Sequence, residues 1–445
     1  MPSELGGPIL SDGTPLRDLV DRDRREVALR VLHDPEIFEL ELERLFARSW
    51  VIVAHDTEVP EPGDYVRRTI GADPVIVTRA RDGEVHVLLN VCSHRGMQLC
   101  WADRGHEAAF RCRYHGWSYA HDGRFVGAPF ERDLYRGELA KDELGLRPAK
   151  VERRHGVVFA TFADDAPPLD EYLGDMAWYV DFAAGGIPEW EVLHGGMLSN
   201  SRYYAANWKP FIEQLAGDSY HAFTTHRAPV DIGLFPTSYY QKGSPDFFGD
   251  HAKVSFPGTG HNVVLLGLWE AWKRNPNIVS SYQVVSEDRE VRQTNDILCE
   301  IFPGNLWMSR PCQLPDGRKV LEALIGSVVP ISPNEFSFQV FTMVPKGLSE
   351  EDRAAIRAMD LLFISLFGVE DNEVFLSIQR ASRGVVGRQQ TLKYATLAGP
   401  SAVEGWPGPG TLHAGDWAGL KDDNQWRFWE RWFDVMCDQG RTPRG

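Results

Sequence analysis

The sequence contains few cysteines, no long apolar run and no excess of basic residues. Six cysteines among 445 residues are too few for a disulfide framework, so we expect a reducing, cytoplasmic compartment. No apolar stretch approaches the roughly 20 residues needed to span a bilayer. The first residues also lack the basic and apolar segments of a secretory signal. We therefore expect a protein that does not enter the membrane.

Acidic residues outnumber basic residues by 63 to 47, which gives a formal net charge of −16 at pH 7. Surfaces that bind nucleic acids are usually basic, so we expect no nucleic-acid partner. The chain is 43% hydrophobic and 25% charged, which is ordinary for a globular protein. Its length suits two domains, or one domain with a large insertion.

Two short segments, CSHRG at 92–96 and CRYHGW at 112–117, each combine one Cys with one His. The pairs are Cys92 with His94 and Cys112 with His115. A Rieske [2Fe–2S] centre needs this set, because two Cys bind one iron and two His replace Cys on the other. Neutral imidazole in place of anionic thiolate raises the reduction potential. The pattern predicts a centre that transfers electrons.

Three other interpretations of these four residues stay open. Zinc also binds two Cys and two His, although zinc-finger patterns usually group the like ligands together. Cys92 and Cys112 could instead form a disulfide, or could simply be buried. The other cysteines are expected to be reduced, buried thiols; they are Cys100, Cys299, Cys312 and Cys437.

The sequence around these segments predicts a small all-β module. Short alternating strands run from position 50 to about 161, with turns at Pro62-Gly63, Asp82-Gly83 and Asp122-Gly123. A helix is expected before the module at 34–47, with Asp34 as N-cap and Pro35 in its first turn.

The rest of the chain mixes helices and strands. A helical linker is expected over 162–200. Further helices are expected at 210–220, 349–380 and 424–436, the second of them opened by a capping box at Ser349. Strands are expected at 262–269, 300–308, 319–329 and 336–344.

A second group of chemically active residues lies in EQLAGDSYHAFTTH at 213–226. Asp218 and His221 are three residues apart and would project from one helix face. His226 joins them only if the helix ends or distorts near 223–225. Two His and one carboxylate form the triad that leaves three positions open on Fe(II). Spacing does not identify the carboxylate, and the candidates are Glu370, Asp371 and Glu373.

Together these motifs resemble the large (α) subunit of bacterial Rieske non-haem iron aromatic-ring-hydroxylating dioxygenases, such as biphenyl and naphthalene dioxygenases. The resemblance covers nearly the whole chain. It includes ELERLFARSW (41–50), NWKPFIEQLAGDSYHAFTTH (207–226), IFPGNLW (301–307) and NQWRFWERWFDVM (424–436).

The resemblance implies an α+β fold. A small all-β Rieske domain is inserted before or into a larger, mixed, helix-grip-like catalytic domain with an antiparallel sheet. The expected ranges are 1–48 for an N-terminal helical part of the catalytic domain, 49–162 for the Rieske domain, and 163–445 for the catalytic domain with its mononuclear iron.

The resemblance also implies the roles of individual residues. The expected ligands of the Rieske [2Fe–2S] cluster are Cys92, His94, Cys112 and His115. The expected ligands of mononuclear Fe(II) are His221, His226 and Asp371, the last because EDN (370–372) matches the family's acidic-Asp-Asn stretch. Asp218 matches the family's bridging aspartate, which links a cluster His of one subunit to an iron-ligand His of the next.

One position departs from the family pattern. Gln214 stands where many of these dioxygenases have an Asn close to the iron, so the pocket shape cannot be transferred by analogy. Offsets from the ligands suggest an apolar pocket wall, with ordinary core packing as the alternative. The residues concerned are Phe211, Leu215, Ala222, Leu361 and Phe367.

The implied activity is that of a terminal oxygenase α subunit. It would use O₂ and electrons from a ferredoxin or reductase, ultimately from NADH, to cis-dihydroxylate an aromatic substrate. The implied assembly is a homotrimer of α subunits, often α₃β₃ with a small β subunit. Alternatives are a Rieske monooxygenase (hydroxylase or demethylase) and a pure electron-transfer protein. Basic residues near the cluster segments could steer an acidic ferredoxin; they are Arg95, Arg104, Arg111 and Arg113.

Overall fold

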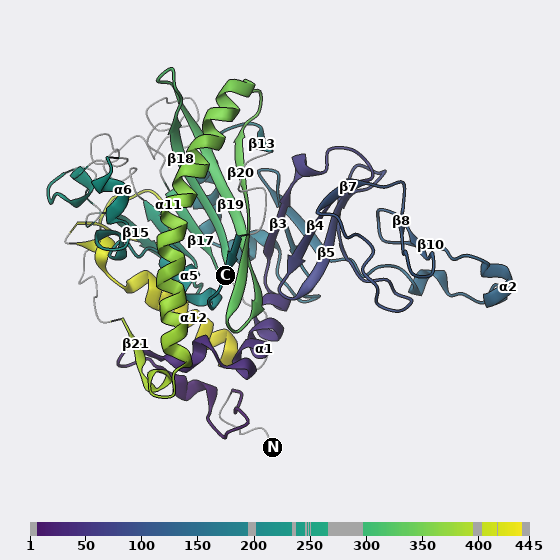
Figure 1. Ribbon diagram of the computed structural model, residues 1–445, viewed down its shortest axis with the longest axis horizontal. Helices are drawn as coiled ribbons and strands as arrows, with labels where there is room; N and C mark the ends of the chain where they lie inside the picture. The colour runs from purple at the N-terminus through teal and green to yellow at the C-terminus, as the bar shows by residue number, and fades with distance from the viewer. Residues whose placement is uncertain are drawn as a thin grey trace. The chain divides into compact units, whose positions relative to one another are not determined.

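The computed structural model describes residues 7–194, 202–233, 237–244, 247, 249, 251–265, 297–394, 403–415 and 417–437, without the side chains of 202, 239, 363, 364, 366 and 367. The chain folds into two compact units (Figure 1). The inserted unit is the continuous segment Phe46–Leu169, and the main unit combines Met1–Leu45 with Asp170–Gly445. Among the described residues, no helix is both long enough and apolar enough to cross a membrane.

The inserted unit is built from three small antiparallel sheets, as the all-β prediction requires. The first contains β6 (Val85–Leu89), β5 (Asp73–Arg79), β4 (Asp64–Ile70) and β7 (Arg104–His106). The second contains β11 (Lys150–Arg154), β12 (Val157–Thr161) and β3 (Val51–His55). The third contains β10 (Phe125–Gly127), β9 (Ser118–Tyr119) and β8 (Phe110–Arg111), and helix α2 (Glu131–Tyr135) follows it.

Two strands of this unit have little apolar alternation. β7 reads RGH and β11 reads KVERR, so neither shows the period of two that marks a half-buried strand. The predicted turns are confirmed: Gly63, Gly83 and Gly123 have φ of 100°, 89° and 86°, values that favour glycine.

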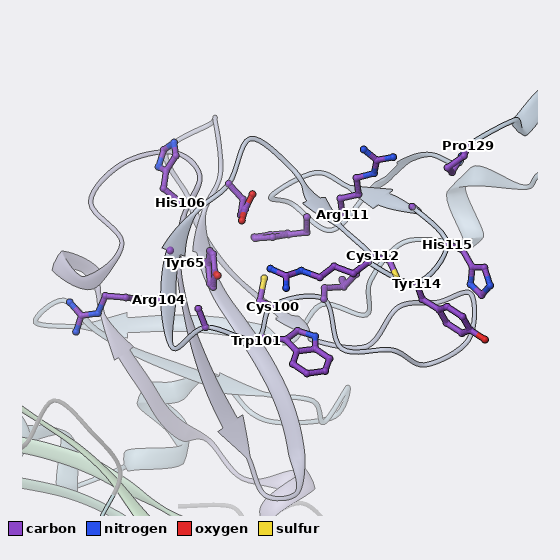
Figure 2. A pocket seen from close by; sticks show the side chains of 17 residues that line it. Tyr65, Cys100, Trp101, Arg104, His106, Arg111, Cys112, Tyr114, His115 and Pro129 are labelled. Atoms are coloured by element: carbon purple, nitrogen blue, oxygen red, sulfur yellow. The ribbon is translucent and has the colours of Figure 1, made fainter.

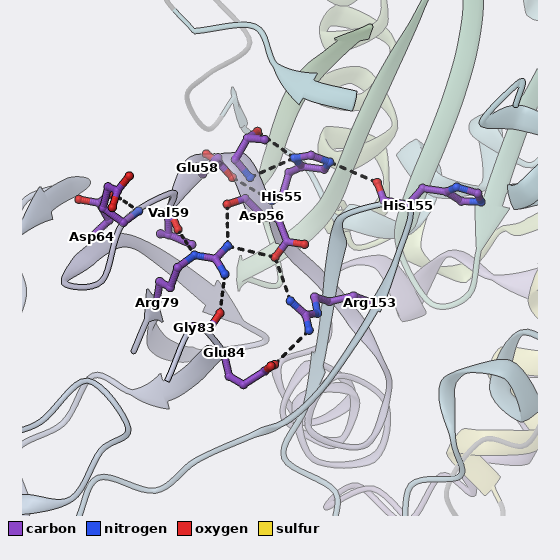
Figure 3. Close-up of polar contacts among 12 residues, drawn as sticks. His55, Asp56, Glu58, Val59, Asp64, Arg79, Gly83, Glu84, Arg153 and His155 are labelled. Carbon is purple, nitrogen blue, oxygen red and sulfur yellow. Dashed lines mark hydrogen bonds and ion pairs between the residues drawn. The ribbon is translucent and has the colours of Figure 1, made fainter. Parts of the chain in front are cut away.

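Polar contacts tie two of these sheets together (Figure 3). The Arg79 guanidinium donates to the carbonyls of Val59 and Gly83, each at 2.6 Å. Arg153 on β11 donates to Glu84 at 3.0 Å. These bonds join the connections around β5 to the second sheet, so the framework that carries the ligand segments is cross-linked by charge-assisted hydrogen bonds.

The main unit is centred on a nine-stranded antiparallel sheet with β14 paired beside β13 on β20. Its strands in order are β13 (Trp190–Val192), β20 (Glu335–Pro345), β19 (Lys319–Ser332), β18 (Asn305–Gln313), β17 (Ile297–Ile301), β16 (Asn262–Leu265), β15 (Ala252–Ser255) and β22 (Thr411–His413), with β14 at Arg202–Tyr204. A separate small sheet joins β1 (Val20–Asp21), β2 (Glu26–Ala28) and β21 (Thr391–Lys393).

The single strand predicted at 300–308 is wrong. These residues form a hairpin of β17 and β18: Pro303-Gly304 lies in the turn between the strands, and Ile301 pairs with Asn305. The strands predicted at 319–329 and 336–344 are confirmed as β19 and β20. Of the strand predicted at 262–269, residues 262–265 form β16 and the remainder lies outside the described residues.

The long helix α11 (Glu350–Arg383) runs along the sheet (Figure 1). Its predicted N-cap is confirmed, since Ser349 accepts a hydrogen bond from the Asp352 amide at 3.1 Å. The other helices are α1 (Pro35–Arg44), α3 (Leu169–Leu173), α4 (Met176–Ala183), α5 (Trp208–Leu215), α6 (Arg227–Asp231) and α12 (Asp423–Cys437). The caps of α1 are also as predicted, with Asp34 accepting from the Glu36 amide.

A buried carboxylate joins three helices of the main unit. Glu41 of α1 is fully buried and accepts from Lys209 at 2.6 Å and from the indole of Trp208 on α5 at 2.9 Å. The indole of Trp432 on α12 donates to the same carboxylate at 2.8 Å. A buried ion pair is stable only when its remaining hydrogen-bonding groups are satisfied, and the two indoles do this here.

Candidate metal centres

The two Cys-His segments of the inserted unit fold into matching loops. In the first, the Cys92 amide donates to the Met97 carbonyl at 2.9 Å and the Gly96 amide donates to the Cys92 carbonyl at 2.9 Å. In the second, the Cys112 amide donates to Trp117 at 2.7 Å and the Gly116 amide donates to Cys112 at 2.9 Å. The loop glycines have φ of 74° and 75°. The chain therefore builds one loop conformation twice.

These loops bring the four residues together. The rings of His94 and His115 lie 4.6 Å apart between centroids, and both Cys92 and Cys112 are buried. All six cysteines are free, so the disulfide interpretation is wrong. Cys437 is only half-buried, unlike the other three thiols expected to be buried.

Aromatic side chains surround the four residues. Trp117 stacks on His94 with centroids 4.6 Å apart and planes within 7°, and Tyr114 packs on His115 at 3.7 Å. The Tyr119 hydroxyl lies 3.1 Å from Cys92 Sγ. No sequence pattern indicates this last contact, because it depends on how strand β9 packs against the first loop.

The donor set fits a [2Fe–2S] cluster. Nδ1 of His94 is buried and has no hydrogen-bond partner among the described residues, a condition that costs about 1–3 kcal/mol unless another group satisfies it. Burial lowers the pKa of His94, with His115 as the next cause, which favours the neutral, ligating imidazole. Burial also raises the pKa of Cys92, so its thiolate needs a neighbouring cation. Two irons held by two Cys and two His would satisfy all of these groups.

A cavity of about 890 Å³ opens beside the second loop (Figure 2). Aromatic and basic side chains line it, among them Trp101, Tyr114, Arg104 and Arg111. Trp101 and Tyr114 are each 58% exposed. Of the four arginines that the sequence placed near the cluster segments, all are exposed, and Arg104, Arg111 and Arg113 line this cavity.

In the main unit, the helix predicted at 210–220 ends at Leu215. Gly217, at φ of 127°, turns the chain, so Asp218 and His221 do not share a helix face as expected. His221 instead begins a 3₁₀ helix, His221–Phe223. Asp218 accepts from the amides of Tyr220 and His221 at 2.9 and 3.2 Å, which fixes its carboxylate at the start of this turn.

Two histidines of this segment meet a carboxylate from α11 at this turn. One nitrogen each of His221 and His226 and one oxygen of Asp371 all lie within 4.8 Å of one another. Asp371 Oδ1 is 3.2 Å from His226 Nε2 and 4.0 Å from His221 Nε2. Among the described residues no other group of this kind is compact enough for a single ion. The set matches the 2-His-1-carboxylate arrangement that suits Fe(II).

Each histidine also contacts a second carboxylate through Nδ1. Asp218 Oδ2 lies 3.3 Å from His221 Nδ1, and Glu370 Oε2 lies 2.9 Å from His226 Nδ1. Burial would raise the pKa of Asp218, but its contacts with His221 outweigh burial and lower it. Burial would lower the pKa of His226, but Asp371 and then Glu370 outweigh it and raise it. Glu373, the third acidic candidate, is exposed.

The Gln214 amide lies against the same three residues. Its Nε2 is 2.8 Å from Asp371 Oδ1 and 2.7 Å from His221 Nε2. The longer side chain noted as a departure from the family pattern therefore reaches candidate ligand atoms of two residues, so a polar amide lies among the atoms that would bind a metal.

The expected pocket-wall residues have different surroundings. Phe211 is buried among aromatic rings, with Phe338 at 5.0 Å and Phe336 at 5.2 Å between centroids. Ala222 is buried and Leu215 is half-buried, whereas Leu361 is 44% exposed. The side chain of Phe367 lies outside the described part of the chain.

Comparison with known families matches each unit. The family model of the Rieske [2Fe–2S] domain matches residues 49–140. The model of the ring hydroxylating alpha subunit (catalytic domain) matches residues 169–432.

Individual relatives span most of the chain. Biphenyl 2,3-dioxygenase subunit alpha of Rhodococcus jostii (strain RHA1) is 31% identical, over 89% of this chain and 86% of that protein. N,N-dimethyl phenylurea N-demethylase subunit alpha of Sphingobium sp. (strain YBL2) is 30% identical, over 94% and 95%. The crystal structure of naphthalene 1,2-dioxygenase from Rhodococcus sp. bound to indole matches with a TM-score of 0.81 and 28% identity, over 96% and 99%. The chain therefore belongs to the family of ring-hydroxylating α subunits, Rieske non-haem iron oxygenases with a [2Fe–2S] domain and a catalytic domain that binds mononuclear iron.

Proposed function

We propose that the chain is the terminal oxygenase α subunit of a multicomponent aromatic-ring-hydroxylating dioxygenase. It would use O₂ and electrons from a ferredoxin or reductase, ultimately from NADH, to form a cis-dihydrodiol. The observation that carries the proposal is the cluster of His221, His226 and Asp371, three ligand atoms within 4.8 Å in a chain that also has paired Cys-His loops. An electron-transfer site and an O₂-activating site in one chain imply that the first serves the second.

We assign each centre its own residues. Cys92, His94, Cys112 and His115 would hold the [2Fe–2S] cluster. His221, His226 and Asp371 would hold Fe(II). When bound, the cluster supplies electrons one at a time, and the iron supplies open positions at which O₂ is reduced.

The protein's own groups then position the reactants. Asp218 would orient His221 through Nδ1, since a carboxylate partner fixes the ring and raises its basicity as a ligand. Gln214 would place its amide beside the ligand atoms, where Nε2 could donate a hydrogen bond to substrate or water. Ala222, Leu215, Phe211, Leu361 and Phe367 are proposed as the apolar wall that would exclude water from an aromatic ring.

We further propose a homotrimer of α subunits, completed by a small β subunit as α₃β₃. In that arrangement His94 or His115 of one copy would pass electrons toward Asp218 of the next. The electron donor would bind in a reducing cytoplasm near the cavity beside the second loop, where exposed Trp101 and Tyr114 accompany arginines. Exposed arginines would attract an acidic partner, and salt would weaken that attraction.

A second candidate is a monooxygenase reaction, in which one oxygen atom of O₂ is inserted into the substrate and a methyl group is lost from nitrogen. It is favoured by the similarity to an N-demethylase α subunit over 94% of this chain. The metal-binding residues of the two reactions would be the same, so the distinction lies in the product.

Labelled dioxygen tests the two candidates directly. The holoenzyme, supplied with ferredoxin, reductase and NADH, is incubated under ¹⁸O₂ with a panel of neutral and carboxylated aromatic compounds and N-methylated arylureas. We expect a cis-dihydrodiol with both oxygen atoms from ¹⁸O₂. Products with a single labelled oxygen, or demethylated arylureas with formaldehyde, would assign the monooxygenase reaction instead.

Metal content tests whether the chain is only an electron carrier. The proposal requires about three irons for every two acid-labile sulfides, because the mononuclear iron adds to the cluster. A ratio of about two to two in active preparations would contradict it.

A further inference from the structure

We propose that Glu370 is a positioning residue that fixes the ring of His226 and thereby determines which ring nitrogen is free to bind the mononuclear metal. The inference rests on the assignment of His226 and Asp371 as metal ligands under the proposed function. It gives Glu370 a role separate from that of a ligand.

Two consecutive residues of α11 contact the His226 ring, one at each ring nitrogen. Glu370 Oε2 lies 2.9 Å from Nδ1, and Asp371 Oδ1 lies 3.2 Å from Nε2. Neighbours on a helix point about 100° apart. The shorter Asp side chain faces Nε2, while the Glu side chain, longer by one methylene, reaches around to Nδ1. A single helix segment therefore holds both sides of one imidazole.

The geometry separates Glu370 from the ligand set. The compact group of possible ligand atoms contains His221, His226 and Asp371, and Glu370 is not part of it. Glu370 contacts the nitrogen of His226 that faces away from this group. Of the acidic residues at 370, 371 and 373, only Asp371 lies within reach of both histidines.

The bond to Glu370 selects the tautomer of His226. A carboxylate is an acceptor only, so Nδ1 must carry the proton and donate it to Glu370. Asp371 Oδ1 faces Nε2, so Nε2 is the nitrogen whose lone pair would bind a metal shared with Asp371 and His221 once its proton is displaced. Metal-bound histidines are commonly fixed in this way, and losing the outer partner typically costs about 10- to 100-fold in metal affinity.

The backbone of His226 is already fixed, so ring rotation is the freedom that Glu370 removes. The Tyr240 hydroxyl lies 2.8 Å from the His226 carbonyl and 2.7 Å from the Ala222 carbonyl. The His226 side chain is only 8% exposed, and that of Glu370 is 24% exposed. Water therefore competes weakly for this bond, unlike at an exposed surface pair.

The test measures iron binding as well as turnover. Holoenzyme carrying Glu370→Ala is stripped of mononuclear iron by mild chelation and titrated anaerobically with Fe(II), with sulfide content as the measure of an intact cluster. We expect iron affinity to fall by about 10- to 100-fold. The electron paramagnetic resonance signal of the Fe(II)–nitric oxide adduct should broaden, because the His226 ring can now rotate.

Two further variants make the result specific. Glu370→Gln keeps an oxygen that can accept from Nδ1, so it should restore most of the affinity and a narrow signal. Glu373→Ala removes an exposed carboxylate three residues along the same helix and should leave iron affinity unchanged. Iron affinity in Glu370→Ala within twofold of the parent, with an unchanged nitric oxide signal, would overturn the proposal.

The ligand assignment fails in a different way. If His226→Ala and Asp371→Ala lose iron while Glu370→Ala keeps it, only the role of Glu370 is wrong. If His226→Ala and Asp371→Ala both retain tightly bound iron, the assignment under the proposed function is wrong, and the inference about Glu370 is overturned with it.

Discussion

The two units of the chain differ in net charge and in how many of their charged residues are buried. The inserted unit contains 17 basic and 18 acidic residues, and none of these 35 residues is fully buried, although the Glu58 side chain is only 5% exposed. The main unit therefore carries nearly all of the net charge of −16. It buries several of its charged residues, among them Glu41, Lys209, Lys253, Glu300, Glu322 and Asp360.

The difference follows from how each unit brings its candidate ligands together. The inserted unit needs only two loops within 24 residues, held on an apolar β framework. The main unit must bring His221 and His226 against Asp371, about 150 positions later. Buried polar networks can specify such long-range arrangements, at a cost in desolvation.

Replacing the metal-binding side chains should have the largest effect and should show that the two metal centres are independent. Cys112→Ser should abolish acid-labile sulfide and visible colour, because a cluster with one thiolate missing is not retained. His226→Ala should lose the mononuclear iron and all product formation, yet keep the colour. Iron and sulfide assays with visible spectra measure both. Loss of both metals in either variant would contradict the separation of the two units.

Asp218→Ala should have the next largest effect, on turnover. With Fe(II) supplied in excess, we expect both metals to be present and product formation to fall by about 10- to 100-fold, because His221 loses the carboxylate beside Nδ1. Single-turnover assays of the pre-reduced protein measure this. Near-normal product formation would refute the bridging role.

Glu300→Gln tests whether the buried acids make only the main unit sensitive to pH. Burial raises the pKa of Glu300 to about 8, from 4.5 in the unfolded chain. The folded state keeps its proton while the unfolded state loses it, so the free energy of unfolding should fall as the pH rises from 4.5 to 8. Gln cannot titrate, and the variant should be more stable than the parent at pH 8 by a few kcal/mol.

Urea unfolding at pH 5 and pH 8 measures this effect. Tryptophan fluorescence is dominated by the main unit, and cluster absorbance follows the inserted unit. The gain should appear in fluorescence and not in absorbance. An equal gain at both pH values would mean that Glu300 is ionised in the folded protein.

Tyr119→Phe should have the smallest effect, confined to the inserted unit. The hydroxyl lies 3.1 Å from Cys92 Sγ and, as a donor, stabilises the more negative, reduced state. A hydrogen bond of about 0.5–1.5 kcal/mol corresponds to a fall of about 20–60 mV for one electron. Tyr135→Phe, beside Trp117 at 6.3 Å, is the matched control. A redox titration in which both variants match the parent would exclude this contribution.

The loops of the inserted unit could be predicted from the sequence because everything that shapes them is local. Cys92, His94 and Gly96 lie within five residues, and the second loop repeats the pattern. The helix that precedes His221 was predicted five residues too long. The helix ends earlier because Gly217, at φ of 127°, turns the chain after Leu215.

The iron site depends on contacts that the sequence does not contain. Asp371 came from family resemblance, because the acidic residues of this helix have similar local surroundings. What distinguishes Asp371 is that it reaches both histidines, whereas Glu370 contacts His226 alone and Glu373 is exposed. The contact between Tyr119 and Cys92 is hidden for the same reason, since strand β9 and the first loop are joined only by tertiary structure.

The buried hydrogen bonds of Glu41 also affect the order in which the chain folds as it is synthesised. The inserted unit is continuous, so all of its partners have left the ribosome once residue 169 has emerged. Helix α1 emerges earlier, but its Glu41 becomes fully paired only after Lys209 and then Trp432 have also emerged. Domains fold as their residues become available. The electron-carrying unit is therefore expected to mature first, and a ribosome stalled before residue 432 would hold a complete inserted unit beside an open catalytic core.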